Sequence, residues 1–308
     1  MILIVSSPDD VHARSVSQKL ELINEQVVFL DTFRCAEHTR LRYRVGRENE
    51  KSLVGSDGQV IPHYDIRTVW IRRPYPPRLR EILDPRDRQF AQAEWHIALD
   101  GLFLSLDARF VNPRSCELNA VKPHQLEVAR RVGLRVPDTL ITNDQGAAQD
   151  FIRFYGERVV HKPMTAPSHR LLDTRRWTRE DWAALDDLPL APTIFQELIT
   201  GPGDVRTTVI GKRTFSAFIA TAQGQAQVDS RLDADAPCTP FELPSDVKQH
   251  ILDLMQELGL LYGAIDLKLT DDGDLVFFEV NPQGQFLYIE ILTGLPISQA
   301  MAELLAGD

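Results

Sequence analysis

The chain has 308 residues, of which 43% are hydrophobic and 25% are charged, so it is not a disordered, collagen-like or disulfide-scaffold protein, and its length predicts two or three domains. Acidic side chains outnumber basic ones by 44 to 34, which gives a formal charge of -10. Such a charge repels phosphate backbones, so we expect no nucleic-acid partner, and an anionic ligand must be met by a local basic patch.

Cysteine usage and hydropathy indicate a cytoplasmic protein. The three cysteines, Cys35, Cys116 and Cys238, lie far apart and form no CxxC motif, which excludes zinc ribbons and thioredoxin-type motifs. No segment approaches the ~18 apolar residues of a membrane span, and the first residues carry no basic region of a signal peptide. We therefore expect a cytoplasmic location and no membrane partner.

The first part of the chain alternates between strand and helix patterns. Apolar periodicity predicts a strand at 2–5, a helix at 11–23 and a strand at 27–30, which together form a β-α-β unit. The loop after the first strand lacks GxGxxG, which excludes a dinucleotide-binding Rossmann domain. A strand at 68–71, a helix at 86–106 and a strand at 109–112 complete a predicted domain of residues 1–115.

After the boundary near Ser115, helix and strand patterns alternate again. Helices are expected at 119–132, closed by Gly133, and at 150–155. A strand at 158–163 ends in Lys162 and a proline. Thr178 and Asp181 have the spacing of a capping box, which predicts that a helix begins at Thr178.

Strand and helix patterns continue through the last part of the chain. Strands are expected at 193–199, 205–210 and 214–221, followed by an amphipathic helix at 244–258 that Gly259 closes. Residues 264–281 then show two alternating apolar runs around an Asp-Gly pair. This pattern is the strongest short-range signal of a β-hairpin, since both residues tolerate a type I′ turn.

The hairpin brings polar residues to one face. With Asp272 and Gly273 as the loop, Asp266 lies directly opposite Glu279. The apolar face then holds Ile265, Leu267, Leu269, Val276, Phe278 and Val280. The other face holds Asp266, Lys268, Glu279 and Asn281.

Two opposed carboxylates predict a cation between them. Their β-carbons lie about 4.5–5.5 Å apart and the charges repel each other. Carboxylate and amide oxygens are ligands that Mg²⁺ takes when phosphates and water complete its octahedron. The alternative is a solvated polar face of a surface hairpin. The irregular loop expected after Asn281, at Pro282 and Gly284, favours a ligand site.

The hairpin and two upstream lysines, Lys122 and Lys162, resemble the ATP-grasp superfamily. Longer segments resemble its microviridin-type branch, the graspetide synthetases, and these segments are Val69-Trp70-Ile71-Arg72-Arg73, Leu140-Ile141-Thr142-Asn143-Asp144, Phe195-Gln196-Glu197-Leu198-Ile199, Asp204-Val205-Arg206 and residues 279–286. The resemblance implies an α/β (α+β) ATP-grasp fold. An N-terminal pre-ATP-grasp domain (1–115) would precede the central (116–195) and C-terminal (196–308) ATP-grasp subdomains.

The resemblance also implies roles for individual residues. The nucleotide would be bound by Lys122, Lys162, Gln196, Glu197, Leu198, Asp266, Lys268 and Glu279. The metal ligands would be Asp266, Glu279 and Asn281. The catalytic groups would be Lys162, Arg206 and Arg231. The peptide substrate would be bound by Arg73, Arg206, Asp229, Arg231 and Gln285. Arg231 stands in Asp229-Ser230-Arg231, where the family has Asp-Trp-Arg.

The implied activity is an ATP- and Mg²⁺-dependent, ADP-forming ligase. It would activate side-chain carboxylates of a ribosomally made precursor peptide as acyl phosphates and join them to hydroxyls or amines of the same peptide. The partner would be a precursor with a leader and an acidic, hydroxyl-rich core, and a homodimer is implied. Two alternatives stay open. One is an amino-acid ligase of the ribosomal-protein-modifying type, and the other is a catalytically silent nucleotide-binding scaffold.

Overall fold

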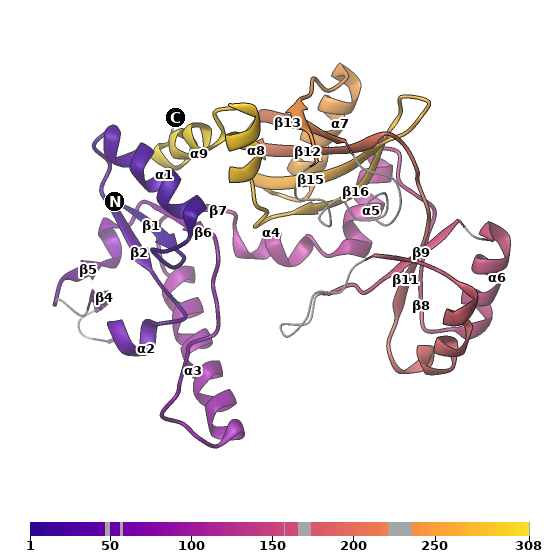
Figure 1. Ribbon diagram of the computed structural model, residues 1–308. Helices are drawn as coiled ribbons and strands as arrows, with labels where there is room; N and C mark the ends of the chain where they lie inside the picture. The colour runs from indigo at the N-terminus through magenta and orange to yellow at the C-terminus, as the bar shows by residue number, and fades with distance from the viewer. Residues whose placement is uncertain (47–49, 56–57, 157, 166–173, 221–235, 308) are drawn as a thin grey trace. The chain divides into compact units, whose positions relative to one another are not determined.

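The computed structural model describes residues 1–46, 50–55, 58–156, 158–165, 174–220 and 236–307 (Figure 1). The chain forms two compact units. The first contains Met1–Arg114, Gln285–Leu287 and Pro296–Asp308, and the second contains Ser115–Gly284 and Tyr288–Leu295. In the described part of the chain, no helix is both long and apolar enough to cross a membrane.

The first unit is built on a four-stranded parallel sheet of order β2-β1-β6-β7. Its strands are β1 (Ile2–Val5), β2 (Val27–Leu30), β6 (Thr68–Ile71) and β7 (Arg109–Val111). Helix α1 (Val11–Leu22) joins β1 to β2, which confirms the predicted β-α-β unit. Asp10 caps α1, because its side chain accepts hydrogen bonds from the N–H groups of His12 and Ala13.

Further elements complete this unit. A three-stranded antiparallel sheet has the order β3-β4-β5. The elements are α2 (Cys35–His38), β3 (Thr39–Arg44), β4 (Glu50–Gly55), β5 (Val60–Pro62), the 3₁₀ helix η1 (His63–Asp65) and α3 (Pro85–Leu104). The last helix, α9 (Ile297–Ala306), packs on α1 and β6. The predicted domain of residues 196–308 includes this helix. An apolar helix face shows that the helix is packed against another surface, but it does not show which surface that is.

In the second unit, one sheet has the order β10-β9-β11-β8, with antiparallel neighbours. Its elements are β8 (Thr139–Thr142), α6 (Gln145–Tyr155), β9 (Val159–Lys162), β10 (Arg175–Arg176), the 3₁₀ helix η2 (Arg179–Leu190) and β11 (Thr193–Glu197). The Asp181 carboxylate accepts a hydrogen bond from the Thr178 N–H at 2.7 Å. This contact confirms the predicted helix start, although the helix is 3₁₀.

The other sheet of this unit is antiparallel, with the order β14-β13-β12-β15-β16. Its strands are β12 (Gly203–Ile210), β13 (Arg213–Ala220), β14 (Cys238–Pro240), β15 (Tyr262–Leu269) and β16 (Leu275–Asn281). The helices of this region are α4 (Arg114–Asn119), α5 (Lys122–Arg131), α7 (Ser245–Glu257) and α8 (Leu287–Thr293). Apolar residues of α5 and α7 share one core with the strands. The division of this unit into central and C-terminal subdomains stays a prediction.

The β15–β16 hairpin differs from its predicted form at the turn. Thr270 N donates to Asp274 O, so the turn is longer than the predicted Asp272-Gly273 pair. A β-bulge after Asp266 compensates, because Leu267 pairs with Phe277 instead of Phe278.

The bulge changes which side chains face the core. Leu275 and Phe277 join the apolar cluster, whereas the prediction placed Val276 and Phe278 on that face. Val276 is fully buried too, but it lies opposite Lys268 on the other face. The predicted apolar face is therefore wrong at these two positions. The opposition of Asp266 and Glu279 is confirmed, because it lies beyond the bulge.

Candidate functional site

The polar face of the five-stranded sheet carries a row of three charged residues. Antiparallel pairing places Arg206 of β12 opposite Asp266 of β15, and Asp266 opposite Glu279 of β16. Nη1 of Arg206 donates a hydrogen bond to Oδ1 of Asp266 at 2.5 Å. The Arg206–Asp266 pair joins opposite charges, whereas Asp266 and Glu279 are two negative charges directly opposite each other, which is unfavourable unless positive charge lies nearby.

Two lysines from other elements join this row. Lys122 is the first residue of α5, and its Nζ lies 3.1 Å from Oε2 of Glu279. Lys162 ends β9, and its Nζ lies 5.7 Å from the ring centroid of Phe278. The structure thus brings together Lys122, Lys162, Arg206, Asp266 and Glu279.

Phe278 is a site residue that the sequence missed. The alternating pattern placed it on the core face, but the bulge leaves it unpaired with β15, and Lys162 lies over its ring. Such cation–π contacts hold an ammonium group in place. No signal in the sequence marks the bulge.

The two carboxyl groups respond differently to this surrounding charge. Burial raises the pKa of Asp266 above its ordinary value, and the negative charge of Glu279 adds to this effect against the opposing charge of Arg206. Burial also acts to raise the pKa of Glu279, but the charges of Lys122 and Lys162 outweigh it and leave that pKa below its ordinary value. A cation between the two groups would stabilise both carboxylates.

The donor set fits Mg²⁺ bound together with phosphates. In the described part of the chain, no group of three or more His, Cys, Asp or Glu side chains is placed to hold a metal ion. Two carboxylates, with Asn281 two residues after Glu279, leave several coordination positions to other ligands. This is the pattern that Mg²⁺ shows at nucleotide sites.

Asn281 is the last residue of β16, immediately before the loop. Its Oδ1 accepts a hydrogen bond from Gln283 N at 2.9 Å, and its carbonyl oxygen accepts one from Gly284 N at 3.1 Å. The side chain is therefore oriented by its own turn.

Lys268 lies on the same face but is only 1% exposed. Its Nζ is 2.9 Å from Oδ1 of Asp204, the residue opposite it on β12. This buried ion pair is next to the Arg206–Asp266 pair along both strands. The predicted nucleotide contact of Lys268 stays a prediction.

The predicted adenine-binding hinge, Gln196 to Leu198, covers the last two residues of β11 and the residue after it. The Gln196 side chain is buried and donates to Oγ1 of Thr139 at 2.8 Å. The N–H groups of Glu197 and Leu198 donate to the carbonyl oxygens of Asp138 and Arg158, each at 2.9 Å. An adenine base that accepts a hydrogen bond from the Leu198 N–H would therefore compete with the Arg158 carbonyl oxygen for this donor.

The other predicted substrate residues stay predictions. Arg73 and Gln285 belong to the first unit, and their roles stay predictions. Asp229 and Arg231 lie outside the described residues.

Gly284 is required by the close approach of neighbouring atoms. A β-carbon at this position would lie 2.3 Å from Cβ of Ala264 and 3.0 Å from Nη2 of Arg206. We expect Gly284→Ala to destabilise the protein by about 1–3 kcal/mol through overpacking. Displacement of Arg206 should also lower ADP formation, measured beside a chemical unfolding curve.

Gly101→Ala is the matched control for this prediction. Nothing lies within 4 Å of a β-carbon at Gly101, which is inside α3. This variant should keep full ADP formation and gain up to about 1 kcal/mol of stability. Equal behaviour of the two variants would contradict the close approach at Gly284.

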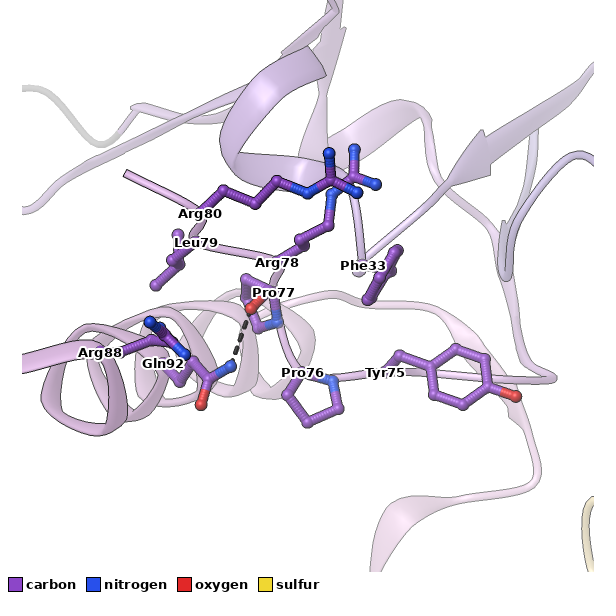
Figure 2. Close-up of a pocket in the computed structure, with 9 residues that line it drawn as sticks. All are labelled: Phe33, Tyr75, Pro76, Pro77, Arg78, Leu79, Arg80, Arg88 and Gln92. Carbon is purple, nitrogen blue, oxygen red and sulfur yellow. Dashed lines mark hydrogen bonds between the residues drawn. The ribbon is translucent and has the colours of Figure 1, made fainter. Parts of the chain in front are cut away.

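The first unit contains a separate open cavity of about 510 Å³ (Figure 2). It is lined by Phe33, Tyr75, Pro76, Pro77, Arg78, Leu79, Arg80, Arg88 and Gln92. Figure 2 shows Gln92 of α3 donating to the Pro77 carbonyl oxygen, at 2.9 Å. None of the predicted site residues that the structure describes lines this cavity.

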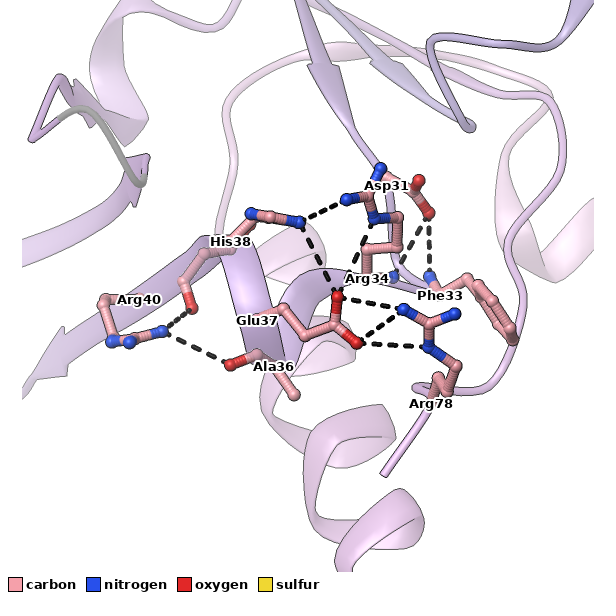
Figure 3. A network of polar contacts seen from close by, with 9 residues as sticks. Asp31, Phe33, Arg34, Ala36, Glu37, His38, Arg40 and Arg78 are labelled. Atoms are coloured by element: carbon pink, nitrogen blue, oxygen red, sulfur yellow. Dashed lines mark hydrogen bonds and ion pairs between the residues drawn. The ribbon is translucent and has the colours of Figure 1, made fainter. Parts of the chain in front are cut away.

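A polar network borders this cavity (Figure 3). Arg78 donates to the Glu37 carboxylate through Nε at 3.1 Å and Nη2 at 2.7 Å, and its guanidinium lies over the Phe33 ring. The hydrogen bond from Arg78 holds the pKa of Glu37 below its ordinary value. These contacts attach the 75–80 segment to α2 and the residues before it.

The comparisons with known proteins cover the entire chain. The family model described as the MvdD pre-ATP grasp domain matches residues 1–117. Macrocyclase MdnC from Microcystis aeruginosa, solved with precursor peptide MdnA, is 30% identical with a TM-score of 0.91, and the match covers 100% of this chain and 99% of that one. Macrocyclase MdnB from the same organism is 29% identical with a TM-score of 0.85, over 100% and 99%.

A RiPP-associated ATP-grasp ligase from Chryseobacterium gregarium, solved with ADP and a leader and core peptide, is also similar. It is 27% identical with a TM-score of 0.91, and the match covers 99% of this chain and 96% of that one. A comparison with curated proteins gave no match.

Proposed function

The chain belongs to the family of microviridin-type ATP-grasp macrocyclases, and from this membership we propose that its charged row binds Mg²⁺-ATP and joins side chains within a ribosomally made precursor peptide. The observation that carries the proposal is the opposed pair Asp266 and Glu279. Lys122, Lys162 and Arg206 surround this pair with positive charge. The enzyme is thus an ADP-forming ATP-grasp ligase, with a precursor peptide of leader and core as its substrate.

The chemistry is an ATP-driven condensation. With Mg²⁺, ATP supplies the phosphoryl group that turns a substrate carboxylate into an acyl phosphate, and a hydroxyl or amine of the same peptide then displaces phosphate. No protein nucleophile is needed, so the protein contributes mainly positioning and charge neutralisation.

The charged row and the residues next to it have different roles in this chemistry. Asp266, Glu279 and Asn281 would hold Mg²⁺. Lys122 and Lys162 bind phosphate oxygens, and Lys162 is positioned by the Phe278 ring. Arg206 orients Asp266 and adds positive charge next to the transferred group.

Substrate carboxylates need their own cations. Arginine binds carboxylates through paired, charge-assisted hydrogen bonds, and we assign this role to Arg73, Arg206 and Arg231. Asp229 and Gln285 would contact the same peptide. A cytoplasmic location and a homodimer complete the proposal.

The test is the intact mass of a Glu/Asp- and Ser/Thr/Lys-rich precursor peptide after incubation with the protein, ATP and Mg²⁺. We expect the loss of one water per crosslink, and no loss without ATP or with the Glu279→Gln protein. Mild alkaline hydrolysis restores the lost mass for esters but not for amides. A gain of one amino-acid residue would instead show an amino-acid ligase, and failure to form ADP would show a silent scaffold.

A further inference from the structure

Gln125 of α5 is a buried polar residue next to the charged row. Its side chain belongs to a residue that is only 3% exposed, and it lies one helical turn after Lys122. The helix packs against β16, which is the edge strand of the five-stranded sheet. The outer N–H and C=O groups of an edge strand lack strand partners and must be satisfied in another way.

The Gln125 amide satisfies both main-chain groups of one β16 residue. Its Nε2 donates to the Val280 carbonyl oxygen at 2.8 Å, and its Oε1 accepts from the Val280 N–H at 2.9 Å. Nε2 also donates to the Ala120 carbonyl oxygen. A single side chain thus replaces one residue of a neighbouring strand.

The position of Val280 connects this contact to the proposed metal ligands. Val280 lies between Glu279 and Asn281, whose side chains point to the face opposite the core. The bulge at Phe278 interrupts the pairing with β15 immediately before Glu279. On the other side of the bulge, Phe277 N donates to the Arg135 carbonyl oxygen at 2.8 Å. The outer edge of β16 is therefore held on both sides of Phe278 and Glu279.

We propose that Gln125 is a positioning residue that holds Glu279 and Asn281 in the geometry that Mg²⁺-nucleotide binding requires. It touches neither ligand, and it acts through the Val280 backbone. Because Lys122 on the same helix pairs with Glu279, α5 sets both the charge next to Glu279 and the position of its strand. This inference rests on the proposed Mg²⁺-ATP site.

Gln125→Met tests the proposal, because methionine has nearly the same length but neither hydrogen-bonding group. In the protein without nucleotide, we expect the Val280 amide hydrogen to exchange about tenfold faster. The Mg²⁺ concentration for half-maximal ADP formation should rise about tenfold, as for other residues that orient metal ligands. Calorimetric affinity for ADP should fall in the presence of Mg²⁺ and stay unchanged in its absence.

A second variant covers the case in which Gln125→Met unfolds. Gln125→Glu keeps the acceptor for the Val280 N–H but loses the donor to the Val280 oxygen. We expect the same Mg²⁺ dependence, with less effect on amide exchange.

Two controls separate positioning from general stability. Val128→Ala removes buried volume from the same helix, and Gln249→Met removes a glutamine of α7 whose side chain donates to the Asp253 carboxylate. Val128→Ala should lower the melting temperature without changing the Mg²⁺ requirement, and Gln249→Met should change neither. If Gln125→Met behaves like Val128→Ala, the proposal is wrong. If the protein without any substitution fails to bind Mg²⁺-ADP, the proposed function is wrong instead.

Discussion

Glu279→Gln is expected to lower ADP formation about 100-fold or more while the fold stays intact. Changes at residues that merely orient metal ligands cost about 10–100-fold, and Glu279 is itself a proposed ligand. The amide has nearly the same size but carries no charge for Mg²⁺. Stability should change by less than about 1 kcal/mol, because repulsion from the opposite Asp266 disappears along with the Lys122 ion pair. ADP release measures turnover, Mg²⁺-ADP calorimetry measures binding of the metal-nucleotide complex, and thermal unfolding measures stability.

Asp274→Asn is the matched control for this change. Asp274 lies at the turn of the same hairpin, and its carboxylate pairs with the exposed Arg135 at 2.7 Å. The same carboxylate-to-amide exchange should leave ADP formation unchanged there. Unchanged turnover in Glu279→Gln would remove Glu279 from the metal site.

Arg206→Met is expected to lower both stability and turnover. The Arg206 side chain is 12% exposed and donates to Asp266. Loss of one partner from a fully buried ion pair costs about 3–5 kcal/mol. Because the Asp266 side chain is 40% exposed, water offsets part of this cost, and we expect about 2 kcal/mol. Turnover should fall about 100-fold, as for the loss of other groups that stabilise transition-state charge. Urea unfolding and ADP formation are the measurements.

The double variant Arg206→Met/Asp266→Asn separates the two effects. It removes the carboxylate that the single change leaves uncompensated, so most of the lost stability should return. Turnover should stay low, because both the arginine and a metal ligand are missing. If the double variant is no more stable than Arg206→Met, Arg206 does not stabilise the fold by neutralising the charge of Asp266.

Local patterns were sufficient for some of the regular elements, but not for α2 or the three-stranded sheet β3-β4-β5, which the sequence did not predict. The predicted bounds of β1, β2 and β6 agree with the structure residue by residue, because short buried strands between turns have a clear apolar signal. The capping contact between Thr178 and Asp181 was also predictable, since it depends on three residues of spacing. The opposition of Asp266 and Glu279 followed from the two-residue period of strands.

Nonlocal packing decided the rest of the site. The longer turn and the bulge moved Phe277 into the core and left Phe278 next to Lys162. The prediction made the turn too short and missed the bulge, and these two errors cancel only beyond the bulge. The carboxylate pair lies beyond the bulge and was predicted correctly, whereas Val276 and Phe278 lie between the turn and this pair and were placed on the wrong face. The role of Gln125 had no sequence signal, because a glutamine in a helix is ordinarily solvated, and its partner lies 155 residues away.

The sequence by itself therefore determined the first β-α-β unit, the opposed carboxylates and, through its motifs, the family. These properties depend on period, spacing and residue chemistry, which act over a few neighbouring residues. Only the tertiary structure decided which lysines reach Glu279, how Arg206 is packed against Gly284, and that α9 joins the first unit. Such contacts depend on how separate elements fill space against one another, and a one-dimensional pattern of polar and apolar residues does not contain that information.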